Sequence, residues 1–91
     1  MNQNNVRALI EMGTALGMAG NFEKAKKYFK HAIKIDENNI IANFRLGKIL
    51  LKKTNEIDQA AECYRRVLMV DQSNAKALSY ISEIYLEKKQ Y

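Results

Sequence analysis

An internal repeat with a period of about 34 residues constrains the fold of this chain more than any other feature. Five positions recur along the sequence: Gly13, Ala25, Phe29, Ala32 and Asp36 return as Gly47, Ala60, Tyr64, Val67 and Asp71. A period in this range is typical of stacked supersecondary units, none of which can bury its apolar face alone. The sequence therefore predicts a short solenoid.

The two halves of the repeat occur in unequal numbers. The first half occurs three times, as Leu9, Met12, Gly13 and Leu16, then as Asn43, Leu46, Gly47 and Leu50, then as Leu78, Ile81, Ser82 and Tyr85. The second half occurs twice, over residues 22–35 and 57–70. The two Gly positions are 34 residues apart whereas the two Asp positions are 35 apart. One residue is therefore inserted in the second repeat, and we place it in a turn over residues 53–56.

The pattern resembles the tetratricopeptide repeat, in which one helix carries a large residue followed by Leu-Gly and Tyr, and the next helix carries Ala and Phe. The resemblance implies an all-α fold, an α-α superhelix in which antiparallel helix pairs form a right-handed solenoid. A single domain would cover residues 1–91, with repeat 1 at about 6–39, repeat 2 at about 40–74 and a half repeat at 75–91. The family's Trp is replaced by Leu9, Asn43 or Leu78, and its Pro by Glu37 or Gln72, which predicts less rigid turns between repeats.

Capping signals divide the chain into five helices, expected over about residues 6–19, 22–35, 40–53, 57–70 and 75 onward. Gly20 and Asn55 are the expected left-handed stops. The expected N-caps are Asn21, Asn38 or Asn39, and Ser73 or Asn74. Chain periodicity directs Val6, Leu9, Met12 and Leu16 inward from the first helix, and Leu78, Ile81 and Tyr85 inward from the fifth.

Gly13 and Gly47 lie in mid-helix, where Gly costs about 1 kcal/mol relative to Ala. We expect a close helix crossing to offset this cost, with Ala25 and Ala60 opposite the two glycines. The half repeat should leave part of an apolar face, including Ile84 and Tyr85, without a partner helix. Two explanations remain open: the chain is a piece of a longer array, or its open end self-associates.

Length and composition limit the class of protein. Ninety-one residues form one domain, and 47% hydrophobic residues with helical periodicity indicate a globular chain. The net charge is +5, but the cations are interleaved with acidic residues along the helices. No segment approaches the ~20 apolar residues of a membrane helix, and the start of the chain lacks the pattern of a signal peptide. We therefore expect a cytoplasmic protein.

The residues that could support catalysis are few, so we expect no enzyme activity, no metal and no cofactor. His31 lies among lysines on the outward side of its helix, and Cys63, which can form no internal disulfide, is expected to be a half-buried structural thiol. No Gly-rich phosphate loop or metal-ligand spacing occurs. The basic cluster of Lys24, Lys26, Lys27 and Lys30 is expected to form a solvated outer face.

Tetratricopeptide arrays, as the resemblance implies, bind peptides or protein surfaces in a concave groove lined by the first helix of each repeat. The candidate groove residues are Arg7, Ile10, Thr14, Ile41, Phe44, Arg45, Lys48, Lys52, Lys76 and Tyr80, with Glu11, Met18, Ser79 and Glu83 beside them. Arg45, Lys48 and Lys52 share one helix face, which suits a partner with acidic and apolar groups. Alternatively, these cations only keep the groove solvated.

The leading functional prediction is a non-catalytic protein-interaction module or scaffold. One subclass of the family grips the C-terminal carboxylate of heat-shock chaperones, but only Lys76 matches its clamp residues, so such a tail is not the expected partner. Pentatricopeptide-like binding of single-stranded RNA is an alternative that the basic charge balance permits. Self-assembly through the open C-terminal helix is another.

Overall fold

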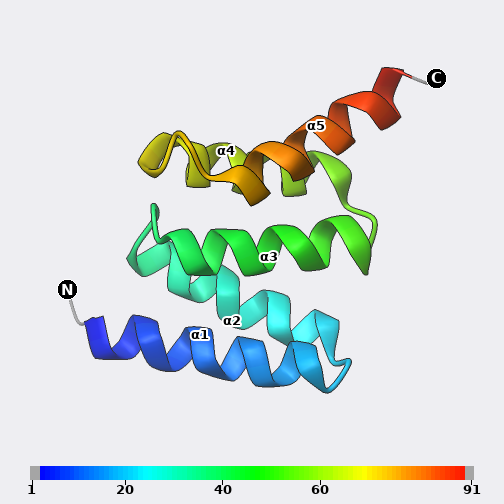
Figure 1. Cartoon of the computed structure of the whole chain (residues 1–91). Helices are drawn as coiled ribbons and strands as arrows, with labels where there is room; N and C mark the ends of the chain where they lie inside the picture. The colour runs from blue at the N-terminus through cyan, green and yellow to red at the C-terminus, as the bar shows by residue number, and fades with distance from the viewer. Residues whose placement is uncertain (1–2, 90–91) are drawn as a thin grey trace.

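Five α-helices make up the fold over residues 3–89, the part of the chain that the computed structural model describes, with side chains described over 5–87. They are α1 (Gln3–Met18), α2 (Phe22–Ile35), α3 (Ile40–Lys52), α4 (Ile57–Val70) and α5 (Ala75–Lys89). Residues 3–89 contain no β-strand (Figure 1). The prediction of an all-α fold with five helices is confirmed, and the bounds of α2 and α4 agree with the expected ones.

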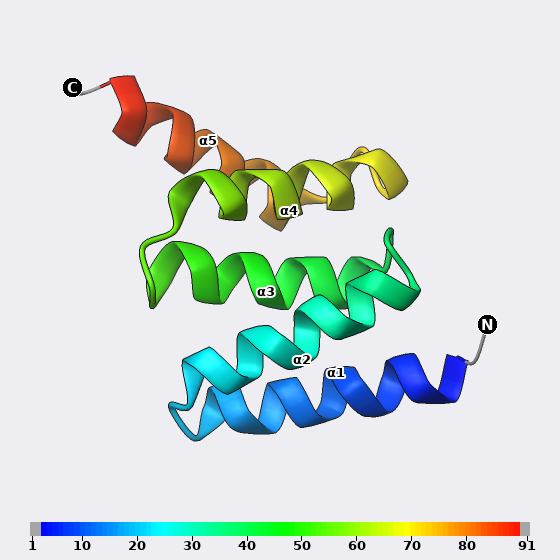
Figure 2. The ribbon, with the colours of Figure 1, turned by 180° about the vertical axis from the view of Figure 1, so that it is seen from behind.

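Consecutive helices form antiparallel pairs that stack side by side. α1 packs against α2 and α3 against α4, while α2 contacts α3 and α4 contacts α5. The two views show α1, α3 and α5 as one layer and α2 and α4 as the other (Figures 1 and 2). The molecule is accordingly flat and elongated, with extents of 41 × 28 × 18 Å.

Each turn within a helix pair contains one residue in the left-handed conformation, as expected. Gly20 has φ 86° and Asn55 has φ 57°. Residues 19–21 connect α1 to α2, whereas residues 53–56 connect α3 to α4, so the longer connection contains the predicted insertion. The prediction that Asn21 caps α2 is wrong, because its side chain makes no capping hydrogen bond. Its backbone N–H instead donates to the carbonyl of Leu16 at 2.8 Å.

The turns between the pairs are closed by asparagine side chains. Asn39 caps α3 by accepting a hydrogen bond from the backbone N–H of Ala42 at 3.0 Å, and Asn74 caps α5 by accepting from that of Ala77 at 2.9 Å. Asn43, at the position of the family's Trp, is fully buried and donates to the carbonyls of Glu37 and Asn39. These bonds stabilise the α2–α3 turn, in which Glu37 stands at the position where the repeat pattern has a proline.

The glycines in mid-helix lie against aromatic rings of the paired helix. A Cβ built on Gly13 would be 2.9 Å from Cε1 of Phe29, and one built on Gly47 would be 2.9 Å from Cζ of Tyr64. The nearest side chains to these glycines are therefore the rings rather than the expected Ala25 and Ala60, and Ala25 instead lies 3.9 Å from the position of a Cβ on Gly17. Because glycine has no side chain, each ring can pack directly against the backbone of the opposite helix.

Equivalent positions of the repeat are buried only where a neighbouring helix covers them. Met12 is 49% exposed although its equivalent Leu46 is 4% exposed, because Leu46 packs on the preceding helix pair. Tyr85 is 47% exposed although its equivalent Leu50, which α4 covers, is 1% exposed. The expectation that Met12, Leu78 and Tyr85 point into the core is wrong, and so is the expectation that Ile84 is uncovered.

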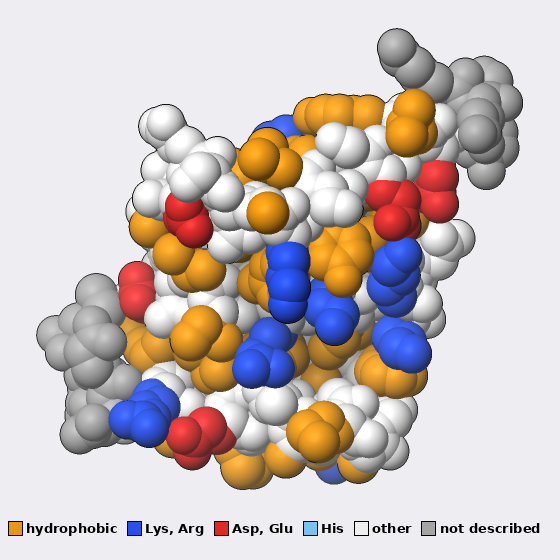
Figure 3. All heavy atoms as spheres, in the orientation of Figure 1, with side chains coloured by type: hydrophobic (Ala, Val, Ile, Leu, Met, Phe, Trp, Pro, Cys, Tyr) orange, Lys and Arg blue, Asp and Glu red, His pale blue; other side chains and the backbone are white. Residues whose placement is uncertain are grey.

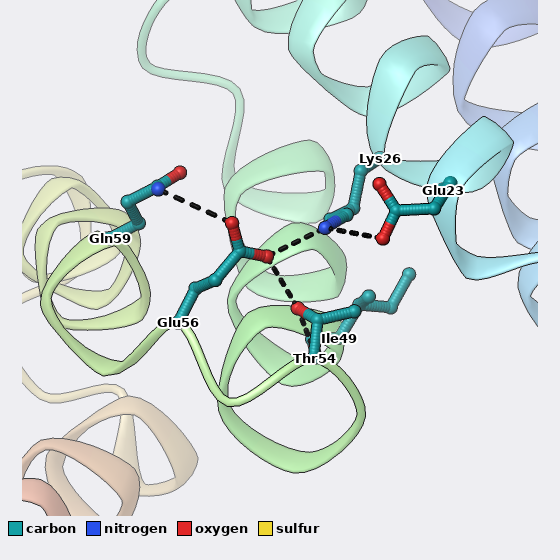
Figure 4. Close-up of polar contacts among 6 residues, drawn as sticks. All are labelled: Glu23, Lys26, Ile49, Thr54, Glu56 and Gln59. Carbon is teal, nitrogen blue, oxygen red and sulfur yellow. Dashed lines mark hydrogen bonds and ion pairs between the residues drawn. The ribbon is translucent and has the colours of Figure 1, made fainter.

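Lys26 does not belong to a solvated outer face, contrary to expectation. Its side chain is 8% exposed, and its ammonium forms ion pairs with Glu56 at 2.6 Å and Glu23 at 3.0 Å (Figure 4). The Glu56 carboxylate also accepts hydrogen bonds from the Thr54 hydroxyl at 2.6 Å and the Gln59 amide at 3.4 Å. This network joins α2 of the first repeat to the α3–α4 turn of the second.

The network shifts the titration of both charges. The hydrogen bond to Glu56 raises the pKa of Lys26 above its ordinary value of 10.5, although burial opposes the change. The hydrogen bonds from Lys26 and Thr54 lower the pKa of Glu56 below its ordinary value of 4.5. The stability that Glu56 contributes is therefore present above pH 4.5 and is lost as the pH falls through its lowered pKa.

We predict that Gly47→Leu lowers the melting temperature sharply. The new side chain would overlap the Tyr64 ring, and overpacking of this kind costs about 1–3 kcal/mol or more. Gly17→Ala is the matched control, because a Cβ there would be 3.6 Å from Cδ1 of Ile49, an ordinary contact distance. Thermal melts followed by circular dichroism measure both changes. Equal melting temperatures for the two variants would contradict the glycine–ring packing.

We predict that Glu56→Gln lowers the free energy of unfolding at pH 7, and that its difference from wild type shrinks between pH 7 and pH 3. The reason is that the carboxylate of the unfolded chain becomes protonated near its ordinary pKa of 4.5, and that of the folded chain at a lower pH, so the ion pair contributes less to the free energy of unfolding as the pH falls. Urea unfolding at the two pH values measures the difference. The exposed Glu37→Gln is the control and should match wild type at both. A difference that does not vary with pH would argue against the ion pair.

Candidate functional site

The surface formed by α1, α3 and α5 is hollowed by three adjoining pockets, which together we name the groove. The central pocket, of about 500 Å³, lies between α1 and α3 and reaches Tyr80 of α5. The N-terminal pocket, of about 560 Å³, lies between α1, along most of its length, and the first half of α3. The α3–α5 pocket, of about 400 Å³, lies between residues 40–48 of α3 and the start of α5. The groove thus follows the first helix of each repeat.

The central pocket combines an apolar floor with a basic rim. Its apolar and glycine lining residues are Gly13, Gly17, Met18, Phe22, Phe29 and Ile49. Its rim carries Arg45, Lys48, Lys52 and Lys53. Gly13 and Gly17 lie one helical turn apart, so at these two positions α1 contributes backbone rather than side chains to the pocket lining. The pocket can accept an apolar group whose surroundings are positively charged.

Arg45 lies where the three pockets meet, since it lines all of them. Lys48, one turn further along α3, lines the central and the α3–α5 pockets. Within residues 5–87, no acidic side chain forms an ion pair with Arg45, Lys48 or Lys76. Figure 3 shows Lys and Arg side chains gathered across the middle of this face. Their charge is available to an anionic partner.

Lys52, the third predicted cation of this helix face, differs from Arg45 and Lys48. Its ammonium forms an ion pair with Glu83 of α5 at 2.6 Å, and it lies 5.8 Å from the centre of the Tyr80 ring. The hydrogen bond to Glu83 raises the pKa of Lys52. Acidic side chains lie beside the basic ones at the C-terminal end of the face (Figure 3). The groove is therefore basic around Arg45 and partly neutralised at Lys52.

Phe44 belongs to an aromatic cluster rather than standing free in the groove. Its ring centre lies 5.8 Å from the centres of both Tyr64 and Tyr80, in edge-to-face geometry. The Tyr64 and Tyr80 rings are stacked with centres 5.3 Å apart. Burial raises the pKa of Tyr64 well above its usual range. The cluster links α3, α4 and α5, and it contributes Phe44 to the α3–α5 pocket and Tyr80 to the central pocket.

The remaining predicted groove residues fall into different environments. Arg7 is exposed and pairs with Glu11 at 3.3 Å, and Ile41 is exposed. The Thr14 hydroxyl donates to the carbonyl of Ile10 at 2.8 Å. Ile10 lines the N-terminal pocket, although its side chain is 8% exposed and belongs largely to the core.

Some groove residues were missed by the sequence prediction. They are the floor residues Gly13, Gly17, Phe22, Phe29 and Ile49, together with Lys53. Phe22 belongs to a second helix and Lys53 to a turn, and the Lys53 ammonium lies 5.6 Å from the centre of the Phe22 ring. The Gly13 and Gly17 pair, four residues apart on one helix, is the sequence signal that could have located the floor.

The chemistry outside the groove gives no second candidate site. Cys63 is buried, and desolvation raises the pKa of its thiol to about 11, which keeps it protonated and unreactive. His31 is exposed on α2. No group of three or more potential metal-binding side chains occurs among the described residues. In the same part of the chain, every helix is too short or too polar to span a bilayer.

Comparison with models of protein families gives one finding. The model described as tetratricopeptide repeat matches residues 16–80. The match extends from the end of α1, through both complete connections between the pairs, into α5. It includes Arg45, Lys48 and the aromatic cluster.

We predict that Phe44→Ala lowers the free energy of unfolding by about 2–3 kcal/mol, less than the range of about 3–5 kcal/mol for fully buried aromatic residues because the ring is half-buried. Arg45→Glu should change it by no more than about 0.5 kcal/mol, since the side chain is exposed and unpaired. Urea unfolding of both variants measures the effects. A Phe44→Ala variant as stable as wild type would contradict the aromatic cluster.

Proposed function

Because the chain belongs to the tetratricopeptide repeat family, we propose that it is a non-catalytic interaction module whose groove binds a peptide or protein surface. Tetratricopeptide repeats mediate protein–protein interaction. The groove of this chain adds a chemical preference, because its basic residues adjoin apolar surface. The proposed partner carries acidic and apolar groups.

One observation carries this proposal: Arg45 and Lys48 are exposed at the junction of the pockets without an acidic partner among the described side chains. Uncompensated cations in a concave surface attract anionic groups and speed their association. A guanidinium also binds a carboxylate through two parallel hydrogen bonds, which fixes its orientation. Neither property requires a catalytic group.

Single-stranded RNA would also be attracted by basic residues. Sequence-tolerant RNA binding, however, needs aromatic faces on which bases stack. The Tyr80 ring is stacked on Tyr64, and Phe44 meets both rings by its edge. Glu11 and Glu83 would repel phosphates at the two ends of the groove. These features favour a protein partner.

We predict that Arg45→Glu/Lys48→Glu loses the partners that the wild-type protein retains from a lysate of cells that express it naturally. The reversed charges would repel an acidic segment, as like charges facing each other across an interface cost affinity. Lys27→Glu/Lys34→Glu is the matched control, since it reverses the same number of charges on the exposed side of α2. Mass spectrometry compares the three sets of captured proteins.

Equal sets from wild type and the groove variant would contradict binding in the groove. Circular dichroism melts of all three proteins establish that the variants are folded. Tight, salt-dependent binding of a mixed-sequence single-stranded RNA that the groove variant alone loses would favour the RNA alternative.

A further inference from the structure

We propose that the partner is an acidic segment with one large apolar side chain, that this side chain enters the central pocket, and that Glu83 confines the partner's carboxylates to the Arg45 and Lys48 end of the groove. This inference rests on the proposed function. It assigns an anchor position, an anion position and a discriminating residue, none of which follows from the fold alone.

The central pocket is built for an apolar anchor. Its volume of about 500 Å³ lies within the range of pockets that bind small ligands, and its floor is formed by Phe29, Ile49 and the bare backbone of Gly17. At Gly17, the nearest atoms to a Cβ would be Cδ1 of Ile49 at 3.6 Å and Cβ of Ala25 at 3.9 Å, so the closest neighbours of this position are apolar. A Leu, Met or Phe side chain of a partner could be buried there, at a gain of about 1.5–3 kcal/mol.

Two of the cations that adjoin this floor, Arg45 and Lys48, belong to α3. Arg45 and Lys48 are three residues apart on α3, so their side chains project from the same helix face. Both line the central pocket, which means that an apolar anchor in the pocket brings neighbouring residues of the partner to these two cations. Carboxylates directly beside the anchor are therefore the complementary chemistry.

Glu83 forms an ion pair with Lys52, the next cation of α3 along the groove. Its carboxylate is 2.6 Å from the Lys52 ammonium and joins α5 to α3. A partner carboxylate can reach Lys52 only by displacing Glu83, whose charge also repels it. Because the two side chains are 45% and 40% exposed, the pair is open to competition rather than locked in the core. Glu83 thus acts as an internal substitute for a partner's acidic group.

The test is selection of peptides from a displayed library of random twelve-residue sequences against the immobilised protein. Parallel selections use Arg45→Glu/Lys48→Glu and the exposed-side control Lys27→Glu/Lys34→Glu. The expected result is enrichment, on wild type and control only, of peptides in which Asp or Glu flanks a Leu, Met or Phe. Substitution of that apolar residue by Ala in a synthetic copy should abolish detectable binding.

The outcomes separate this inference from the proposed function. Neutral or basic peptides that require Arg45 and Lys48 would overturn the acidic partner while leaving groove binding in place. Peptides that bind the groove variant as well as wild type, or no enrichment on any protein, would count against the groove itself and hence against both proposals.

A second measurement tests Glu83. A selected peptide extended by Asp or Glu toward α5 should bind Glu83→Gln more tightly than wild type, by about fivefold or less given the strength of exposed ion pairs. The unextended peptide should bind both proteins equally, which controls for any change in fold. Unchanged or weaker binding of the extended peptide to Glu83→Gln would show that Glu83 does not discriminate.

Discussion

The structure depends on one close contact, between an aromatic ring on the second helix of each pair and a glycine on the first. Phe29 lies on Gly13 and Tyr64 on Gly47, at distances that a Cβ on either glycine would not permit. Each contact offsets the unfavourable helix propensity of glycine by bringing the two backbones together. The third copy has Ser82 at the equivalent position, and there a ring could not approach the backbone as closely.

The same contacts shape the groove. Gly13 and Phe29 line the central pocket, and Tyr64 contacts the rings of Phe44, which lines the α3–α5 pocket, and of Tyr80, which lines the central pocket. The part-buried ion pair of Lys26 with Glu56 connects consecutive repeats. A single-residue change in the packing of a pair would therefore alter both the stability of the protein and the surface proposed to bind its partner.

Local signals in the sequence predicted the elements of this fold well. The period, the left-handed Gly20 and Asn55 and the caps Asn39 and Asn74 depend only on nearby residues, so they could be recognised without coordinates. The exposure of Met12, Leu78 and Tyr85 could not be predicted in this way, because the same repeat position is covered in the middle of a stack and uncovered at its ends.

The candidate site was predicted in part, for a related reason. The register of the first helix of each repeat was enough to assign Arg45, Lys48 and Tyr80 to the groove, and all three line the central pocket. The charge of the groove depends on contacts between residues distant in the sequence, such as Lys52 with Glu83. Likewise, Lys26 is buried because it pairs with Glu56, a turn residue of the next repeat. Sequence spacing on one helix carries no information on such pairs.

The most direct test of the account is a nuclear Overhauser measurement on the isotope-labelled protein. Cross-peaks between the α-protons of Gly47 and the ring protons of Tyr64, and between those of Gly13 and Phe29, are expected to be strong, with the glycine α-protons shifted by the ring currents. Rings that show no cross-peaks to these glycines would contradict the packing on which the helix pairs and the groove depend.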